Sequence, residues 1–189
     1  MNSIKKIICF PIFLLTFFIH SKAKADIQQR IVTLTSLSTD LVNEIAPDAL
    51  IGVSGSKIIK DKKKFKDKVF VTEGRNPPDL EKIISLKPTL VIGAKGFHDK
   101  ALNKLNSLGI NIIHTEIRNW EDLENLNNQL ANVIGKESNK LKTLLDDCYP
   151  KSNRIRDNIV VLATLKPLVS PNSKSWSGSL LERFKFNNL

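Results

Sequence analysis

The chain alternates short apolar runs with segments whose apolar residues recur at helical spacing. Runs of strand length occupy residues 31–36, 50–53, 69–71, 89–92 and 110–113. Between them the apolar positions follow a helical period, as in Asn119 to Ile134, which Gly135 closes. Strands that alternate with helices favour a parallel sheet covered on both faces, so we predict an α/β fold with a Rossmann-like lobe.

One block of the pattern is compact enough to predict in detail. Asn76 is a good N-cap and Pro77 suits the first helical position. Leu80, Ile83 and Ile84 form an apolar stripe, and Pro88 stops the helix. We predict a short buried strand directly after this turn.

The same pattern divides the chain into four parts. We expect a signal peptide at 1–25, a Rossmann-like lobe at 26–134, a linking helix at 135–157 and a partial second α/β lobe at 158–189. The last part contains a predicted strand, 159–165, and a predicted helix, 178–186.

The N-terminus has the layout of an export signal. Lys5 and Lys6 precede a nearly continuous apolar stretch, 7–19, and Ala23-Lys24-Ala25 is a small-x-small cleavage site. We therefore expect a mature chain that begins at Asp26 in the periplasm. The alternative is an uncleaved membrane anchor.

Charge and cysteine content narrow the functional classes. The net charge is +10, and removal of the signal, which carries four lysines and no acid, leaves +6. Seven of the remaining lysines crowd residues 57–68, either as an anion- or membrane-binding patch or as a solvated loop. No nucleic-acid motif accompanies them, so we expect no nucleic-acid partner. Cys148 alone remains after cleavage and excludes an internal disulfide.

Several phrases resemble one family, the class III substrate-binding proteins of vitamin B12 and ferric-siderophore ABC importers. Residues 79–92 are similar to its "nLEkIlaLkPDLVi", and Arg30 to Ser36 to its opening "RIVsLsPs". Leu50 to Val53, and Leu108 to Ile113 followed by Trp120 to Leu123, match further phrases in the same order.

The resemblance implies a binding protein without catalysis or cofactor. Such a protein captures a cobalamin-like or ferric-siderophore ligand between two lobes and delivers it to the importer's membrane subunits, and we expect a monomer. About a hundred more residues normally follow the second lobe's first strand and helix, so we expect a chain shortened there. The alternative is a ligand-free interaction or structural module made of one lobe.

Candidate ligand-binding residues follow from the sheet, because ligands of open α/β sheets meet the loops at the strands' carboxyl ends. In those loops, Phe97 is placed to stack on a ligand, and Arg75 or Lys95 to pair with an anionic group. The full candidate set is Ser36, Ser38, Ser54, Glu73, Arg75, Lys95, Phe97 and, from the second lobe, Trp176. The resemblance assigns Glu81 to docking on the membrane subunits; alternatively, it is a first-turn acid favoured by the helix dipole.

Two other kinds of site are disfavoured. His98 and His114 form a possible metal pair, but no cluster of acids or histidines completes a ligand set, so we expect no metal. Phosphate-binding glycine loops and a G-x-S-x-G nucleophile turn are absent from the sequence, so we predict no enzyme.

Overall fold

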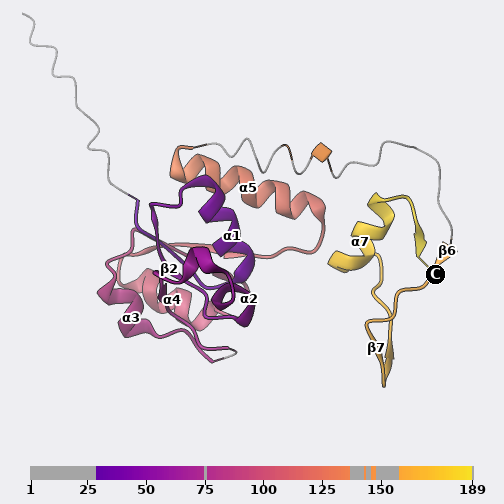
Figure 1. The fold of residues 1–189 in the computed structure, drawn as a ribbon, viewed down its shortest axis with the longest axis horizontal. Coiled ribbons are helices and arrows are strands. Elements are labelled where there is room, and N and C mark those ends of the chain that lie inside the picture. Colours follow the sequence, from indigo (N-terminus) through magenta and orange to yellow (C-terminus); the bar gives the residue numbers. More distant parts are fainter. Residues whose placement is uncertain (1–28, 75, 137–142, 144–145, 148–157, 189) are drawn as a thin grey trace, which may run out of the picture.

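A computed structural model describes residues 29–74, 76–136, 143, 146–147 and 158–188 (Figure 1). The predicted signal peptide lies wholly outside these residues, and the predicted linking helix lies almost wholly outside them. Among the described residues, no helix combines the length and the apolar character needed to cross a bilayer.

Five parallel strands form the central sheet. They are β1 (Ile31–Thr33), β2 (Leu50–Val53), β3 (Val69–Phe70), β4 (Leu90–Ala94) and β5 (Asn111–Thr115). Their order is β3-β2-β1-β4-β5, and every neighbouring pair is parallel. The predicted strands and the parallel α/β class are confirmed. The first strand is shorter than predicted because Thr35 already caps the next helix.

The order of the strands reverses between β1 and β4. The chain builds outward from β1 through β2 and β3, and then returns to the other side of β1 for β4 and β5. A doubly wound sheet opens its ligand crevice at this point, at the carboxyl ends of the strands.

Helices cover both faces of the sheet, and strand periodicity sorts the core between them. Ile31 packs with residues of α1 (Ser36–Ile45) and α5 (Trp120–Ile134), together with the short α2 (Lys57–Lys60) and the 3-10 helix η1 (Lys63–Phe65). Its neighbour Val32 points to the opposite face. There it packs with α3 (Leu80–Ser85) and α4 (Asp99–Ser107). The prediction of a sheet covered on both faces is therefore confirmed.

Helix ends follow local capping chemistry, with one exception to the prediction. Asn119 accepts a hydrogen bond from the backbone N–H of Asp122 at 2.8 Å, and Gly135 ends α5 at φ 72°, as expected. The predicted cap at Asn76 is wrong. Asp79 caps α3 instead, because its carboxylate accepts from the Lys82 N–H and its own N–H donates to the carbonyl of Val71.

The C-terminal described segment is built from short pieces. β6 (Asn158–Ile159) pairs with β9 (Asn187–Asn188), and β7 (Thr164–Leu165) forms a hairpin with β8 (Leu168–Val169). The predicted continuous strand 159–165 is wrong, because these two partners pair only with its ends. The predicted helix 178–186 is instead α7 (Trp176–Arg183), which begins two residues earlier because Ser175 accepts from the Gly178 N–H.

Candidate functional site

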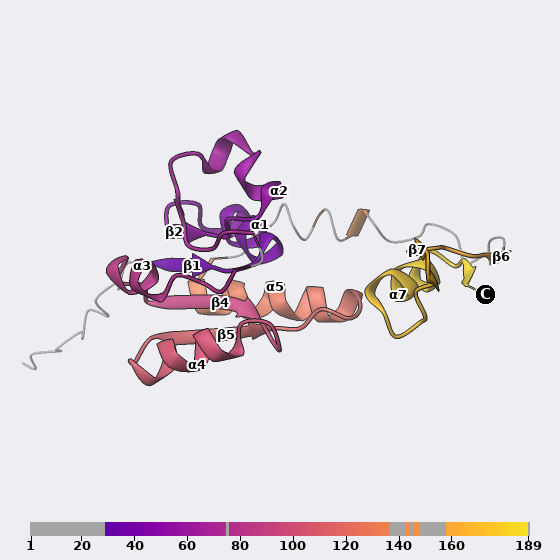
Figure 2. The same cartoon turned by 90° about the horizontal axis from the view of Figure 1, so that it is seen from below.

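The loops that follow the five strands lie at one edge of the sheet, because all five strands are parallel. We call this the carboxyl edge; its loops are residues 34–36, 54–56, 71–74, 95–98 and 116–119. The segment containing α7 lies beyond the ends toward which the strands point (Figure 2). The carboxyl edge and the segment containing α7 therefore lie on the same side of the lobe.

Hydroxyl groups at this edge bind one another and the backbone of the loops. Ser36 Oγ and Ser56 Oγ lie 2.7 Å apart and join the loops after β1 and β2. Thr35 Oγ1 and Ser38 Oγ lie 2.6 Å apart, and the Thr35 hydroxyl also accepts from the Ser38 N–H. Ser38 is 0 % exposed and Ser54 is buried, so these two candidates support the loops and leave Ser36 as the half-exposed hydroxyl.

A glycine permits the loop after β2 to touch the loop after β3. The backbone N–H of Gly55 donates to Thr72 Oγ1 at 2.7 Å. A Cβ atom at Gly55 would lie 1.7 Å from the backbone oxygen of Thr72, which no side chain tolerates. This close approach was not predicted. Its signal in the sequence is Gly55 between two serines of a loop, because glycine lets two backbones come close together.

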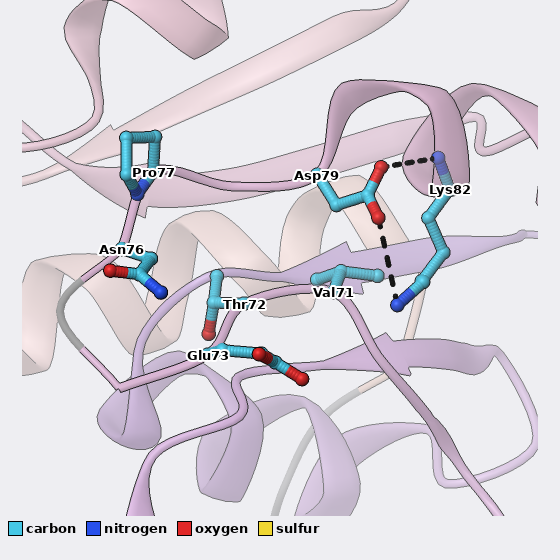
Figure 3. Close-up of a pocket in the computed structure, with 7 residues that line it drawn as sticks. All are labelled: Val71, Thr72, Glu73, Asn76, Pro77, Asp79 and Lys82. Carbon is cyan, nitrogen blue, oxygen red and sulfur yellow. Dashed lines mark hydrogen bonds and ion pairs between the residues drawn. The ribbon is translucent and has the colours of Figure 1, made fainter.

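A depression of about 340 Å³ lies beside the end of β3 (Figure 3). Its lining residues are Val71, Thr72, Glu73, Asn76, Pro77, Asp79 and Lys82. The candidate Glu73 is exposed here, whereas Arg75 lies outside the described residues. Asp79 is occupied by Lys82, through its backbone N–H at 2.9 Å and its Nζ at 3.6 Å.

A second depression, of about 350 Å³, lies between the end of β5 and α5. Its charged groups pair internally: Lys95 Nζ contacts Glu116 Oε2 at 2.8 Å, and Arg118 Nε contacts Asp122 Oδ2 at 3.7 Å. The hydrogen bond from Lys95 and its positive charge, followed by that of Arg118, lower the pKa of Glu116. Lys95 is therefore at the predicted edge, but its ammonium group has a carboxylate partner.

Phe97 is the large apolar side chain that the carboxyl edge exposes most. It is 66 % exposed, and its ring meets His98 edge-on with 4.8 Å between ring centroids. His98 is buried, and its Nδ1 accepts from the Ala94 N–H at 2.9 Å. Burial lowers the pKa of His98, partly offset by the nearby Asp99 carboxylate. His98 is thus a neutral support beneath Phe97.

The sequence also raised His98 and His114 as a possible metal pair, and the structure places both residues. His114 Nδ1 lies 3.2 Å from Asp99 Oδ1. Within the described residues no group of three or more histidine, cysteine or acidic residues is arranged to hold a metal ion.

Trp176 docks on the first lobe. Its ring stacks on that of Trp120, and Arg183 lies over Trp120 with 4.3 Å from the guanidinium carbon to the ring centroid. Arg183 Nη2 also lies 3.8 Å from Glu124 Oε1. The prediction included Trp176 but missed its partners Trp120 and Arg183. These residues are far apart in the sequence, so their contact becomes visible only when α5 and α7 are placed together.

Glu81 lies in the first turn of α3 and is exposed. It is therefore accessible to a partner, and it also meets the helix dipole favourably. These two roles are compatible, because a first-turn side chain on the surface can meet the helix dipole and a partner at once.

Comparison with known proteins agrees with this architecture. Residues 31–189 match the family described as periplasmic binding protein, so the chain belongs to that family. The iron-uptake system-binding protein of Bacillus subtilis (strain 168) is 31% identical over 106 residues, 54% of this chain and 32% of that protein. The vitamin B12-binding protein of Salmonella typhi is 31% identical over 105 residues, again 54% of this chain, and 37% of its own length. The matches thus span about a third of each curated relative.

The fold itself has solved counterparts. An ABC transporter substrate-binding protein from Listeria monocytogenes EGD-e superposes with a TM-score of 0.69 at 18% identity, over 85% of this chain and 64% of that one. The family resemblance noted in the sequence is confirmed, as is the prediction of a binding protein in place of an enzyme. Family membership also implies an extracytoplasmic location.

Proposed function

We propose that this chain is the substrate-binding component of an ABC importer. It captures a cobalamin-like or ferric-siderophore ligand in the periplasm and delivers it to the importer's membrane subunits. Two relatives that are named for binding vitamin B12 and for iron uptake support this range of ligands. Neither favours the alternative of a ligand-free interaction module.

The observation that carries the proposal is the exposed Phe97 ring beside the switch point of the sheet. Phe97 follows β4, and Ser36 follows β1, so both lie just after the two strands between which the order reverses. Covering an exposed aromatic ring contributes about 1.5–3 kcal/mol. A flat or aromatic-rich ligand fits this requirement, and Ser36 supplies a hydroxyl for its polar rim.

Charged groups at the rim are further proposed contacts for the ligand. Glu73 is exposed on the β3 side, and Lys95 lies next to Phe97 with its ion-pair partner Glu116. A carboxylate- or phosphate-bearing ligand would compete with Glu116 for the Lys95 ammonium. We propose Trp176 as the contact from the C-terminal segment, because α7 lies on the side of the lobe toward which the strands point (Figure 2).

Calorimetric and absorbance titrations with cobalamin, a ferric siderophore and haem test this proposal. We expect one of the three to bind, and Phe97→Ala to weaken that binding about tenfold or more without changing the melting temperature. Leu108→Ala is the matched control, because Leu108 is 52% exposed at the C-terminal end of α4, away from the carboxyl edge. A folded protein that gives no heat or spectral change with any of the three would overturn the proposal.

A further inference from the structure

Residues 56–68, here called the basic projection, extend from the β3 edge of the sheet as α2 and η1 (Figure 2). Two side chains fix them to the body of the lobe. Ile59 and Phe65 are both fully buried in the core cluster that also contains Ile31. The basic projection is therefore a packed part of the lobe, and its surface groups have defined positions.

Some of its lysines are used to hold this shape. Lys62 Nζ pairs with Asp40 Oδ2 at 2.5 Å, and Lys64 Nζ lies 3.6 Å from the other oxygen of Asp40. Lys68 Nζ donates to the carbonyl of Leu50 at 2.7 Å. These contacts attach the projection to α1 and to the first residue of β2.

Three other lysines face solvent. Lys57, Lys63 and Lys66 are exposed, and none makes an ion pair within the part of the chain that the structure describes. Residues 56–68 contain seven lysines and two exposed acids, Asp61 and Asp67, so the projection has a charge of +5. Asp40 and Glu44, which face it from α1, reduce this to +3. The surface stays basic after the acids that form ion pairs with it are counted.

An apolar side chain stands within this basic surface. Ile58 is 65 % exposed, directly after Lys57 on α2. An exposed isoleucine between the lysines of α2 suits a lipid interface: the apolar group enters the boundary region, and the lysines reach headgroup phosphates. A free small anion would use the lysines but gain nothing from Ile58.

We propose that the basic projection docks this protein reversibly on an anionic lipid surface. The occupant is a bilayer leaflet rich in phosphatidylglycerol-like headgroups. Each lysine near such a surface strengthens binding by about fivefold, since its contribution is about 1 kcal/mol. With Ile58 as the only exposed large apolar side chain of the described residues 56–68, binding stays weak and reversible, as a carrier protein requires. The inference does not depend on which ligand the carboxyl edge binds.

Vesicle co-sedimentation of the protein recovered after export tests the proposal. We expect binding to vesicles of phosphatidylglycerol and phosphatidylcholine in equal parts, little binding to pure phosphatidylcholine, and release by 0.5 M salt. Lys63→Gln with Lys66→Gln should weaken binding about thirtyfold, and Ile58→Ser should weaken it separately.

Matched controls lie on the opposite face of the sheet. Lys100→Gln with Lys104→Gln removes the same charge from exposed positions of α4, and Ile84→Ser removes a 42% exposed isoleucine of α3. Both should bind vesicles within about twofold of the unchanged protein. Equal losses in the test and control variants would reduce the effect to net charge and overturn the proposal. Binding to heparin or an acidic peptide but not to vesicles would also overturn it.

Discussion

The rings of Trp120 and Trp176 stack with 5.9 Å between centroids and 11° between planes. They join the first residue of α5 to the first residue of α7. The sequence contains only these two tryptophans, so the contact between the two parts of the chain carries its own spectroscopic probe.

Trp176→Ala should loosen residues 158–188 from the first lobe. The change removes an aromatic pair whose contribution is about 0.5–1.5 kcal/mol beyond buried area. Trp120 then becomes more exposed, and its fluorescence should shift to longer wavelength. Hydrogen exchange should accelerate across 158–188 and change little in β1, β4 and β5.

Leu165→Ala is the control, because Leu165 is 74 % exposed on the hairpin and contributes little burial. The same exchange experiment tests the predicted division of the chain at residues 134 and 158. Uniformly slow exchange in both parts of the unchanged protein would contradict that division.

Gly55→Ala should destabilise the lobe by about 3 kcal/mol, because the new Cβ would meet the Thr72 carbonyl at 1.7 Å and separate two loops. Gly96→Ala is the comparison: at φ 78° it carries conformational strain, but no atom lies within 4 Å of its Cβ position. We expect a loss of about 1 kcal/mol there. Urea unfolding measures both changes, and equal losses would show that the close approach is not the cause.

Stability should fall as the pH is lowered from 7 to 5, partly through His98. Burial lowers its folded-state pKa below 6.5, so the unfolded chain binds the proton more readily. The contribution is fully present above pH 6.5 and is lost as the pH falls through the folded pKa. Protonation also places a hydrogen on Nδ1, which now accepts from Ala94.

Proton NMR of the His98 ring should give a titration midpoint below 6.5, and His98→Asn should flatten the pH dependence of the urea midpoint. A ring midpoint at or above 6.5 would contradict the role of burial.

Glu81→Lys should reduce ligand uptake by cells at least tenfold while leaving ligand titration of the purified protein unchanged. The reason is that the docking contact that the family resemblance implies for Glu81 would lose its carboxylate and carry the opposite charge. Asp48→Lys is the control, because Asp48 is exposed just before β2, at the edge opposite the proposed docking residue. Equal uptake by both variants would remove Glu81 from the docking surface.

Protein recovered from the cell envelope should begin at Asp26. The reason is the small-x-small site at Ala23 to Ala25 after an apolar stretch that is short for a membrane span. N-terminal sequencing measures this directly. A chain that retains residues 1–25 and resists extraction from membranes would favour the anchor alternative.

Much of the fold was predictable because its signals are local. The strand at residues 50–53 was placed to the residue, and α5 begins one residue after the predicted start because Asn119 is its cap. Apolar periodicity and capping chemistry act within a few residues, so they appear in the sequence as they appear in the structure.

The errors occurred where partners distant in sequence decide the outcome. Asp79 displaced Asn76 as the cap of α3 because its N–H is held by Val71, and no local pattern shows that contact. The predicted strand 159–165 separated into β6 and β7 because each found a different short partner.

The sequence by itself determined the alternation of strands and helices, the family and the loops that reach the carboxyl edge. The tertiary structure decided which candidates in those loops remain accessible. It buried Ser38 beside Thr35, the cap of α1. It paired Lys95 with Glu116 and left Phe97 exposed next to His98. Burial and pairing depend on which loops meet at the carboxyl edge. The order of the strands decides which loops meet, and the residues of a single loop cannot encode that order.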